Sequence, residues 1–233
     1  MVPISSSSKK DFASTAERIA DSLRADILRG RLKSRQPLRQ DEIAAEFRVS
    51  KIPVREALFQ LKAEGLVSFS PNRGAAVSEV SADEADEIYT MRIALETVVL
   101  RRSIPRLTVA DLSRAEEILD AIDHEQDVAR WGELNWEFHT ALYDAANMPR
   151  LMAWVKNLHV SVSRYLVLYL AGLDYQAASQ REHREILEAC RRGNAEAAAA
   201  CLEHHLRSAS NQLISFLKQE KTSQKTSKDR RKK

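Results

Sequence analysis

Two cations at the start of a predicted helix are the first side chains with clear chemistry. Lys51 and Arg55 lie four residues apart, directly behind Ser50, and serine is a favoured N-cap residue. Pro53 falls in the first turn, where its missing N–H costs nothing, so residues 51–64 are predicted to form one helix. Its apolar residues share one face, which leaves positive charge and hydrogen-bond donors exposed on the other. Such donors suit the phosphates and base edges of nucleic acid.

A second short helix is predicted just upstream, over residues 41–47. Only Arg48 and Val49 separate this helix from Ser50. Two helices with so short a joint have the spacing of a helix-turn-helix, whose second helix enters the DNA major groove by its N-terminal residues.

This stretch resembles the signature of the GntR family of bacterial transcription regulators. The matching residues are Val49-Ser50-Lys51-Ile52-Pro53-Val54-Arg55-Glu56-Ala57-Leu58, Leu61 and Glu64-Gly65-Leu66. Residues 12–80 as a whole resemble the winged helix-turn-helix domain of that family, which implies a double-stranded DNA partner. The DNA contacts expected from the resemblance are Arg39, Ser50, Lys51, Ile52, Arg55, Arg73 and Gly74. Lys51 stands where the family usually has Arg, so a two-pronged contact to guanine is absent there.

Two short alternating segments follow the predicted recognition helix. Residues 66–70 and 75–80 have the pattern of strands and are separated by Pro71-Asn72-Arg73-Gly74. In the resembling family this hairpin is the wing, whose tip touches the DNA backbone or minor groove. A surface hairpin with an incidental Arg73 is the alternative interpretation.

From Ser81 onward the apolar residues follow a helical period. Helices are predicted at about 82–103, 108–124, 127–146, 149–171, 176–192 and 194–218. The predicted fold is therefore mainly α: an N-terminal winged helix-turn-helix followed by an all-α antiparallel bundle. The bundle resembles the FCD effector domain of the FadR branch of GntR regulators. The likeness rests on the segments 91–96, 135–142, 146–151, 182–187 and 205–206.

Three histidines on apolar helix faces are candidates for metal binding. Periodicity directs His183 and His205 inward and puts His139 at the border of an apolar face, with Asn135 one turn before it. A lone core histidine is more often a hydrogen-bonding residue than a ligand. The FCD resemblance implies a divalent metal held by these four residues, and imidazole-rich ligation suits Zn or Ni.

Arg92 lies on the apolar stripe of its predicted helix, and a buried Arg without an anion is costly. Glu96, one turn on, offers a core salt bridge. The resemblance instead implies a clamp for a small organic acid, with His159 and Arg164 as further effector-binding candidates. A metal-dependent hydrolase is the alternative from another class, because three histidines can hold a metal that activates water. Against it, no inward Glu or Asp is predicted beside the histidines.

Charge is distributed unevenly along the 233 residues. The net charge is +4 for residues 1–80, −6 for residues 81–219 and +5 for residues 220–233. Residues 1–11 and the basic tail 220–233 are predicted to be disordered, and the tail either adds nonspecific DNA affinity or is merely solvated. Residues 12–80 and 81–219 are the predicted DNA-binding and effector-binding domains.

Apolar runs are too short for a membrane helix, and the polar start lacks the apolar core of a signal peptide. We therefore expect a cytoplasmic protein without a membrane partner. With the family resemblance, these features predict a homodimeric, ligand-responsive repressor or activator that reads a pseudo-palindromic operator and is not an enzyme.

Overall fold

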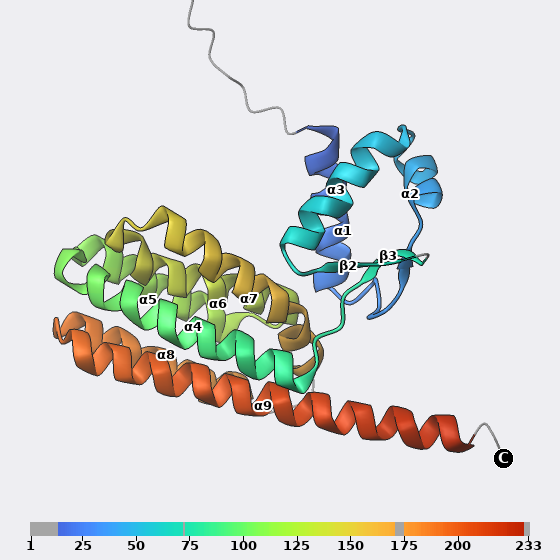
Figure 1. The fold of residues 1–233 in the computed structure, drawn as a ribbon. Coiled ribbons are helices and arrows are strands. Elements are labelled where there is room, and N and C mark those ends of the chain that lie inside the picture. Colours follow the sequence, from blue (N-terminus) through green and yellow to red (C-terminus); the bar gives the residue numbers. More distant parts are fainter. Residues whose placement is uncertain (1–13, 72, 171–174, 231–233) are drawn as a thin grey trace, which may run out of the picture.

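The computed structural model describes residues 14–71, 73–170 and 175–230, with the side chains of residues 164, 166–170, 220 and 222–230 left out of the description. Buried apolar residues form two clusters, one in an N-terminal region and one in a helical bundle. Figure 1 shows the two regions side by side, joined by the segment between β3 and α4. No helix among the described residues combines the length and apolarity that crossing a bilayer requires.

The N-terminal region is built from three helices and a small sheet. The helices are α1 (Thr15–Leu28), α2 (Gln40–Phe47) and α3 (Lys51–Ala63), and the strands are β1 (Pro37–Leu38), β2 (Val67–Ser70) and β3 (Gly74–Val77). The strands pair antiparallel in the order β1-β3-β2. Ser14 and Glu17 form a capping box that starts α1. The sequence prediction missed β1, because two residues carry no readable period.

The bundle contains the elements α4 (Ala82–Ser103), α5 (Val109–His124), α6 (Val128–Tyr143), α7 (Pro149–Leu170), α8 (Tyr175–Arg191) and α9 (Ala195–Arg230). Ser81 and Thr108 each begin a capping box, which explains why the starts of α4 and α5 were readable from sequence. Short 3₁₀ turns at 104–106 and 144–146 follow α4 and α6. The longest helix, α9, packs against α4 and α8.

The C-terminal segment differs from the prediction. Residues 220–233 were expected to be disordered, whereas α9 continues to Arg230. Nothing between residues 195 and 230 is Gly or Pro, and Lys, Gln and Glu are good helix formers, so no residue stops the helix. Leu217 is the last described residue of α9 in the buried core, and Figure 1 shows the helix running on past the bundle. The predicted disorder of residues 1–11 concerns residues outside the described part.

The two regions touch between α3 and α7. The Ser161 hydroxyl donates to the carbonyl oxygen of Glu64 at 3.2 Å, and Val160 packs against the N-terminal core. Gly65, directly after α3, has φ +74°, and a Cβ built there would come within 2.7 Å of Ser161 Oγ. A Cβ at residue 65 would therefore displace the Ser161 hydroxyl and disturb its hydrogen bond to Glu64.

Gly65→Ala is expected to lower the free energy of unfolding by more than Gly193→Ala. Gly193 has a similar φ of +66° but open space around its Cβ, so it reports the left-handed conformation alone, a cost of about 1–2 kcal/mol. The additional loss at Gly65 measures the contact with Ser161. Urea unfolding of both variants gives the comparison.

Adding Ser161→Ala to Gly65→Ala should restore most of the additional loss, because the clashing oxygen is removed. Equal losses in the two glycine variants would show that α3 and α7 do not meet as described.

Candidate functional site

The tip of α3 presents two cations and one apolar side chain to solvent. Lys51 and Arg55 are exposed, and Ile52 between them is 70% exposed. The opposite face of the helix is fully buried, through Val54, Ala57, Leu58 and Leu61. Ser50 is the N-cap residue as predicted, but its hydroxyl makes no capping hydrogen bond. The core therefore fixes the helix, while its first turn faces outward.

The exposed cations have weak or adaptable partners. Lys51 Nζ lies 2.5 Å from Asp41 of α2, but both side chains are exposed, and such pairs contribute little to stability. The Arg55 guanidinium lies 5.5 Å from the centre of the Phe59 ring, which stacks on Phe69 of β2 at 5.1 Å. This aromatic pair was not predicted. The pair packs α3 against β2 of the wing, and the Phe59 ring makes a cation–π contact with the Arg55 guanidinium.

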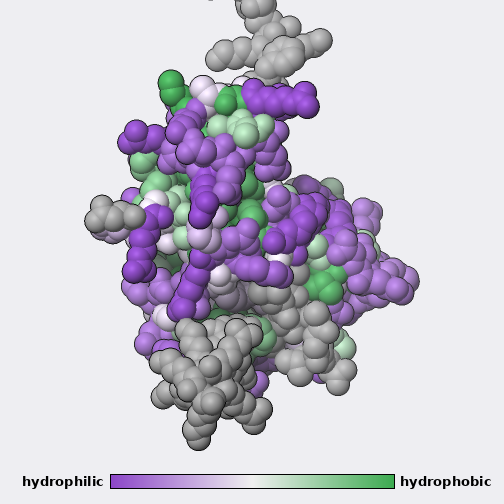
Figure 2. Space-filling view, turned by 90° about the vertical axis from the view of Figure 1, so that its right-hand side faces the viewer, coloured by the Kyte–Doolittle hydropathy of each residue, from purple (hydrophilic) through white to green (hydrophobic). Residues whose placement is uncertain are grey.

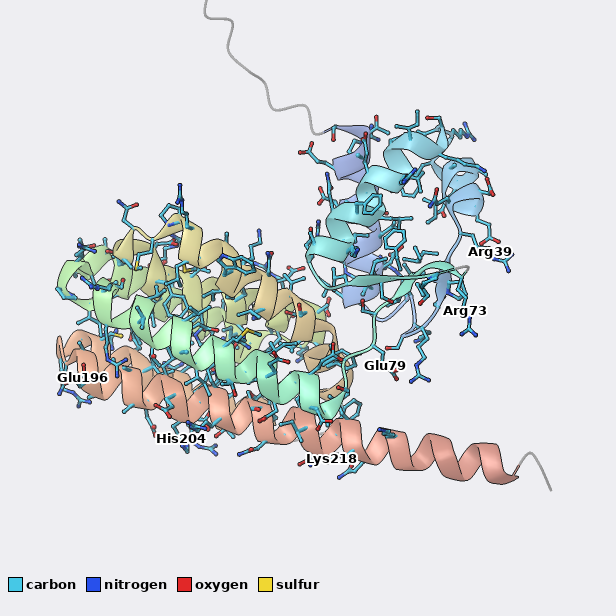
Figure 3. The ribbon with its side chains drawn as sticks, viewed as in Figure 1. Arg39, Arg73, Glu79, Glu196, His204 and Lys218 are labelled. Carbon is cyan, nitrogen blue, oxygen red and sulfur yellow. The ribbon has the colours of Figure 1, made fainter. Side chains whose placement is uncertain are left out.

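The wing and the loop before α2 add further exposed cations. Arg73 is exposed beside Gly74, whose φ of +73° belongs to the hairpin turn. Arg39 precedes α2 and contacts Glu42 at 3.3 Å through an exposed pair. Figure 3 shows Arg39 and Arg73 both pointing away from the N-terminal region. Hydrophilic residues cover most of the face seen in Figure 2, with smaller apolar patches between them.

A second candidate site lies inside the bundle, where His139 of α6, His183 of α8 and His205 of α9 meet. Their side chains are buried, and one ring nitrogen from each lies within 4.8 Å of the others. His183 Nε2 is 3.3 Å from His205 Nε2. Periodicity directed His183 and His205 inward, and the FCD resemblance implied that they meet His139. His204, next to His205, is exposed, as Figure 3 shows.

The outer nitrogen of each imidazole contacts a polar side chain. His205 Nδ1 lies 2.8 Å from Glu182 Oε2, and His183 Nδ1 lies 2.9 Å from Gln180 Oε1. His139 Nδ1 has a longer contact of 3.4 Å to the hydroxyl of Tyr143. Such partners orient an imidazole and fix which nitrogen carries the proton, leaving the other free to bind a metal.

Two buried polar atoms at this cluster have no hydrogen-bond partner among the described residues. They are His139 Nε2 and Asn135 Oδ1. Asn135, His139 and His205 line a common cavity of about 10 Å³, which is the scale of one water or one ion. Leaving buried polar atoms without hydrogen-bond partners costs free energy. These two atoms are therefore suited to coordinate a bound cation.

The expectation that no acid lies beside the histidines is wrong. Glu182 contacts His205, and Glu96 is fully buried one hydrogen bond beyond His139, accepting from the Tyr143 hydroxyl at 2.8 Å. Glu182 is adjacent to His183 in sequence, and its helix packs against α9, so it reaches a partner that helical periodicity alone did not indicate.

Burial governs the protonation of the cluster. Desolvation first, and then the charge of neighbouring imidazoles, hold the pKa values of His139 and His183 well below the ordinary value. Both rings are therefore neutral at pH 7. Neutral imidazole is the form that binds metals.

Arg92 is buried and forms the salt bridge with Glu96 that the sequence offered as one alternative, at 2.7 Å. Burial acts to lower the pKa of Arg92, but the charge of Glu96 and the neighbouring Tyr89 outweigh it, so the pKa is raised. Arg92 also lines the small cavity together with His159. The side chain of Arg164 lies outside the described part of the chain.

Two family models match the chain. The model described as "Bacterial regulatory proteins, gntR family" matches residues 15–77, and the model described as "FCD domain" matches residues 87–208.

Named relatives are similar over most of their length. The HTH-type transcriptional repressor RspR of Escherichia coli (strain K12) is 27% identical over 81% of this chain and 84% of its own. The HTH-type transcriptional regulator McbR of the same organism is 30% identical over 77% of this chain and 80% of its own. The gluconate operon transcriptional repressor of Bacillus licheniformis is 31% identical over 67% and 65%, respectively.

Solved structures share the fold. The structure of E. coli McbR/YncC aligns with a TM-score of 0.75 at 24% identity, covering 90% of this chain and 99% of that one. A GntR transcriptional regulator from Rhodococcus sp. RHA1 aligns with a TM-score of 0.75 at 28% identity, covering 86% and 97%.

Without metal, the protein is expected to lose stability as the pH falls below about 6.5, the ordinary histidine pKa. The unfolded chain binds protons there, whereas folded His139 and His183 stay neutral, so acid favours unfolding. His183→Gln should reduce the slope of unfolding free energy against pH by up to about 1.4 kcal/mol per pH unit. Urea titrations with a chelator, from pH 7.5 to 5.5, measure the slope.

His204→Gln, on the exposed side of α9, is the matched control. An unchanged slope in the His183 variant would contradict a neutral, buried His183.

Proposed function

The chain belongs to the GntR family of bacterial transcription regulators and carries an FCD domain, and from this premise we propose a ligand-controlled repressor whose α3 tip reads operator DNA. The observation that carries the proposal is the outward presentation of Lys51, Ile52 and Arg55 on a helix whose other face is fully buried. The relatives named as repressors support the sign of regulation. Because family and relatives are regulators, the hydrolase alternative is not retained.

Each DNA-facing residue has a proposed role. Arg55 reaches base edges in the major groove, and Lys51 exchanges its exposed partner Asp41 for a phosphate. Ile52 contacts the thymine methyl group, and Ser50 donates to the backbone. Arg73 and Gly74 in the wing, with Arg39 before α2, contribute backbone contacts, which supply most of the affinity and make it salt-dependent.

Dimerisation is part of the proposal, since two recognition helices reading successive major grooves explain a pseudo-palindromic operator. Met91 and Val98 of α4 are seven residues apart, so they lie near one face of the helix, and they are 39% and 43% exposed. Exposed apolar side chains at this spacing support a helical partner surface on α4. The regulator is proposed to act in the cytoplasm.

The proposed metal ligands are Asn135, His139, His183 and His205. The support is that two buried ligand atoms, His139 Nε2 and Asn135 Oδ1, have no hydrogen-bond partner among the described residues, and that the lowered pKa values of His139 and His183 keep these two rings neutral. A bound ion would supply a Lewis-acidic centre in the cavity that Arg92 also lines. Imidazole-rich ligation favours Zn or Ni. Gln180 and Glu182 orient two of the rings from outside.

A small carboxylate is the proposed effector, with Arg92, His159 and Arg164 as its binding residues. Arg92 already holds Glu96, so an incoming carboxylate must compete with that internal anion. The cavity of about 10 Å³ admits no organic acid without movement of its walls. Binding therefore selects a rearranged bundle. An effector controls DNA affinity only through its differential affinity for the two arrangements.

Arg55→Ala should weaken binding to a selected operator by about 5- to 150-fold, the equivalent of roughly 1–3 kcal/mol for a base contact. Arg73→Ala should weaken binding to all DNA sequences similarly. It should also reduce the slope of the logarithm of affinity against the logarithm of salt concentration by about one. Fluorescence anisotropy with duplexes selected from a random pool, over a salt series, measures both effects.

Arg207→Ala serves as the control, because Arg207 is an exposed arginine on α9 in the bundle, paired with Glu203. If the operator affinity of the Arg55 variant matched that of this control, the assignment of α3 as the recognition helix would fail.

His183→Ala combined with His205→Ala should abolish bound metal, because two of the proposed ligands are lost. Elemental analysis after equilibration with Zn²⁺ or Ni²⁺ measures it, and a chelator should lower the melting temperature of the wild type but not that of the double variant. The control variant His204→Ala should keep the wild-type metal content. Equal metal content in the double variant and the wild type would refute the ligand set.

A further inference from the structure

A larger cavity lies where the N-terminal region meets the bundle. Its walls come from α1, α6 and α7, and its volume is about 180 Å³. An engineered apolar cavity of about 150 Å³ is known to bind benzene, so this one has room for a single ring with a small substituent. The cavity beside the histidines is far smaller, at about 10 Å³.

The walls of this interdomain cavity are mainly apolar and partly aromatic. Leu28 of α1 and Val160 of α7 contribute aliphatic surface. The rings of Trp136 and His159 stack on each other at 4.3 Å with an angle of 22° between their planes, and both residues line the cavity. Aromatic side chains in the lining favour an aromatic ring as the occupant.

The charges around the interdomain cavity are unbalanced. Arg29 and Lys156 line it, both are exposed, and neither has an ion-pair partner among the described side chains. Glu133, the one acid among the described residues of the lining, is already bonded to Arg130 at 2.9 Å. Burial, and then the charge of Arg92, hold the pKa of His159 well below its ordinary value, so this ring is neutral. The surplus of positive charge favours an anionic occupant.

We propose that the interdomain cavity is a binding site for a small planar aromatic carboxylate, whose ring lies against Trp136 and His159 and whose carboxylate faces Arg29 and Lys156. This site goes beyond the effector site at Arg92, which lies inside the bundle. His159 lines both cavities, so an occupant here touches the wall of the metal cavity.

The position of this site allows its occupant to change the affinity for DNA. One wall belongs to α1, which packs on α3, and the other walls belong to the bundle. A ligand that fits only one spacing of α1 and α7 shifts the population toward that spacing. It alters operator affinity without touching the recognition helix.

Benzoate is the probe, and full-length protein is titrated with it by calorimetry and by quenching of tryptophan fluorescence. Saturable binding of benzoate, with at least tenfold weaker binding of neutral benzamide and of non-planar cyclohexanecarboxylate, is the expected result. No saturable binding of benzoate, or equal binding of the three probes, overturns the proposal.

Two variants fill the cavity without disturbing the metal ligands. A Cβ at Gly132 of α6 meets no atom within 4 Å, so Gly132→Leu adds bulk at the lining, and Ala129→Leu does so one turn earlier. Both should weaken benzoate binding at least tenfold while metal content stays at the wild-type level. Lys156→Gln should weaken benzoate several-fold and leave benzamide unchanged.

Wild-type affinity for benzoate in both filling variants would place the ligand elsewhere, at Arg92 included, and would overturn the interdomain site. Metal content and operator binding are measured in parallel. Their failure would count against the repressor proposal, whereas loss of benzoate binding alone bears only on this cavity.

Discussion

Three imidazoles buried together need polar partners on every nitrogen, and this requirement shapes the bundle. Glu182, Gln180 and Tyr143 occupy the outer nitrogens. The Gln180 and Tyr143 contacts lie within α8 and α6, whereas the Glu182 contact joins α8 to His205 of α9 and so fixes how these two helices are rotated relative to each other. The inner nitrogens are left facing each other, and His139 Nε2 has no partner among the described residues. Such an arrangement is costly for a core that stays empty and favourable for one that holds a cation. The bundle is thus built around a polar centre that packing alone does not satisfy.

From this centre, one chain of hydrogen bonds and one shared cavity wall lead toward other parts of the molecule. One runs from His139 through Tyr143 and Glu96 to Arg92, in hydrogen bonds of 3.4, 2.8 and 2.7 Å. The other passes through the wall shared by the two cavities, where His159 stacks on Trp136 beside α1. Hydrogen-bonded and packed networks of this kind carry coupling only if they have two arrangements. The small volume of the inner cavity supplies one reason for a second arrangement, because no organic acid enters the first.

Much of this was readable from the sequence, and the reasons are local. Helical periodicity predicted the helices of the bundle and was enough to turn His183 and His205 inward, and the structure adds that Ser81 and Thr108 cap two of these helices. The contact of Glu182 with His205 was missed because it crosses between helices. β1 was too short to show a period, and α9 runs on because nothing in its sequence stops it. The interdomain cavity depends on how α1 approaches α6 and α7, and no local pattern encodes that approach.

The close approach of α3 to α7 sets how a change in the bundle can reach DNA. Gly65 lets the end of the recognition helix lie against Ser161. The Tyr165 hydroxyl accepts from the backbone N–H of Val80 at 2.7 Å, in the segment between β3 and α4. Both contacts come from the half of α7 that follows His159. A shift of α7 therefore moves the N-terminal region as one rigid unit, because the core of that region is continuous from α1 to the sheet. In a dimer, such a rigid displacement changes the separation of two recognition helices, and that separation must match the spacing of the operator half-sites.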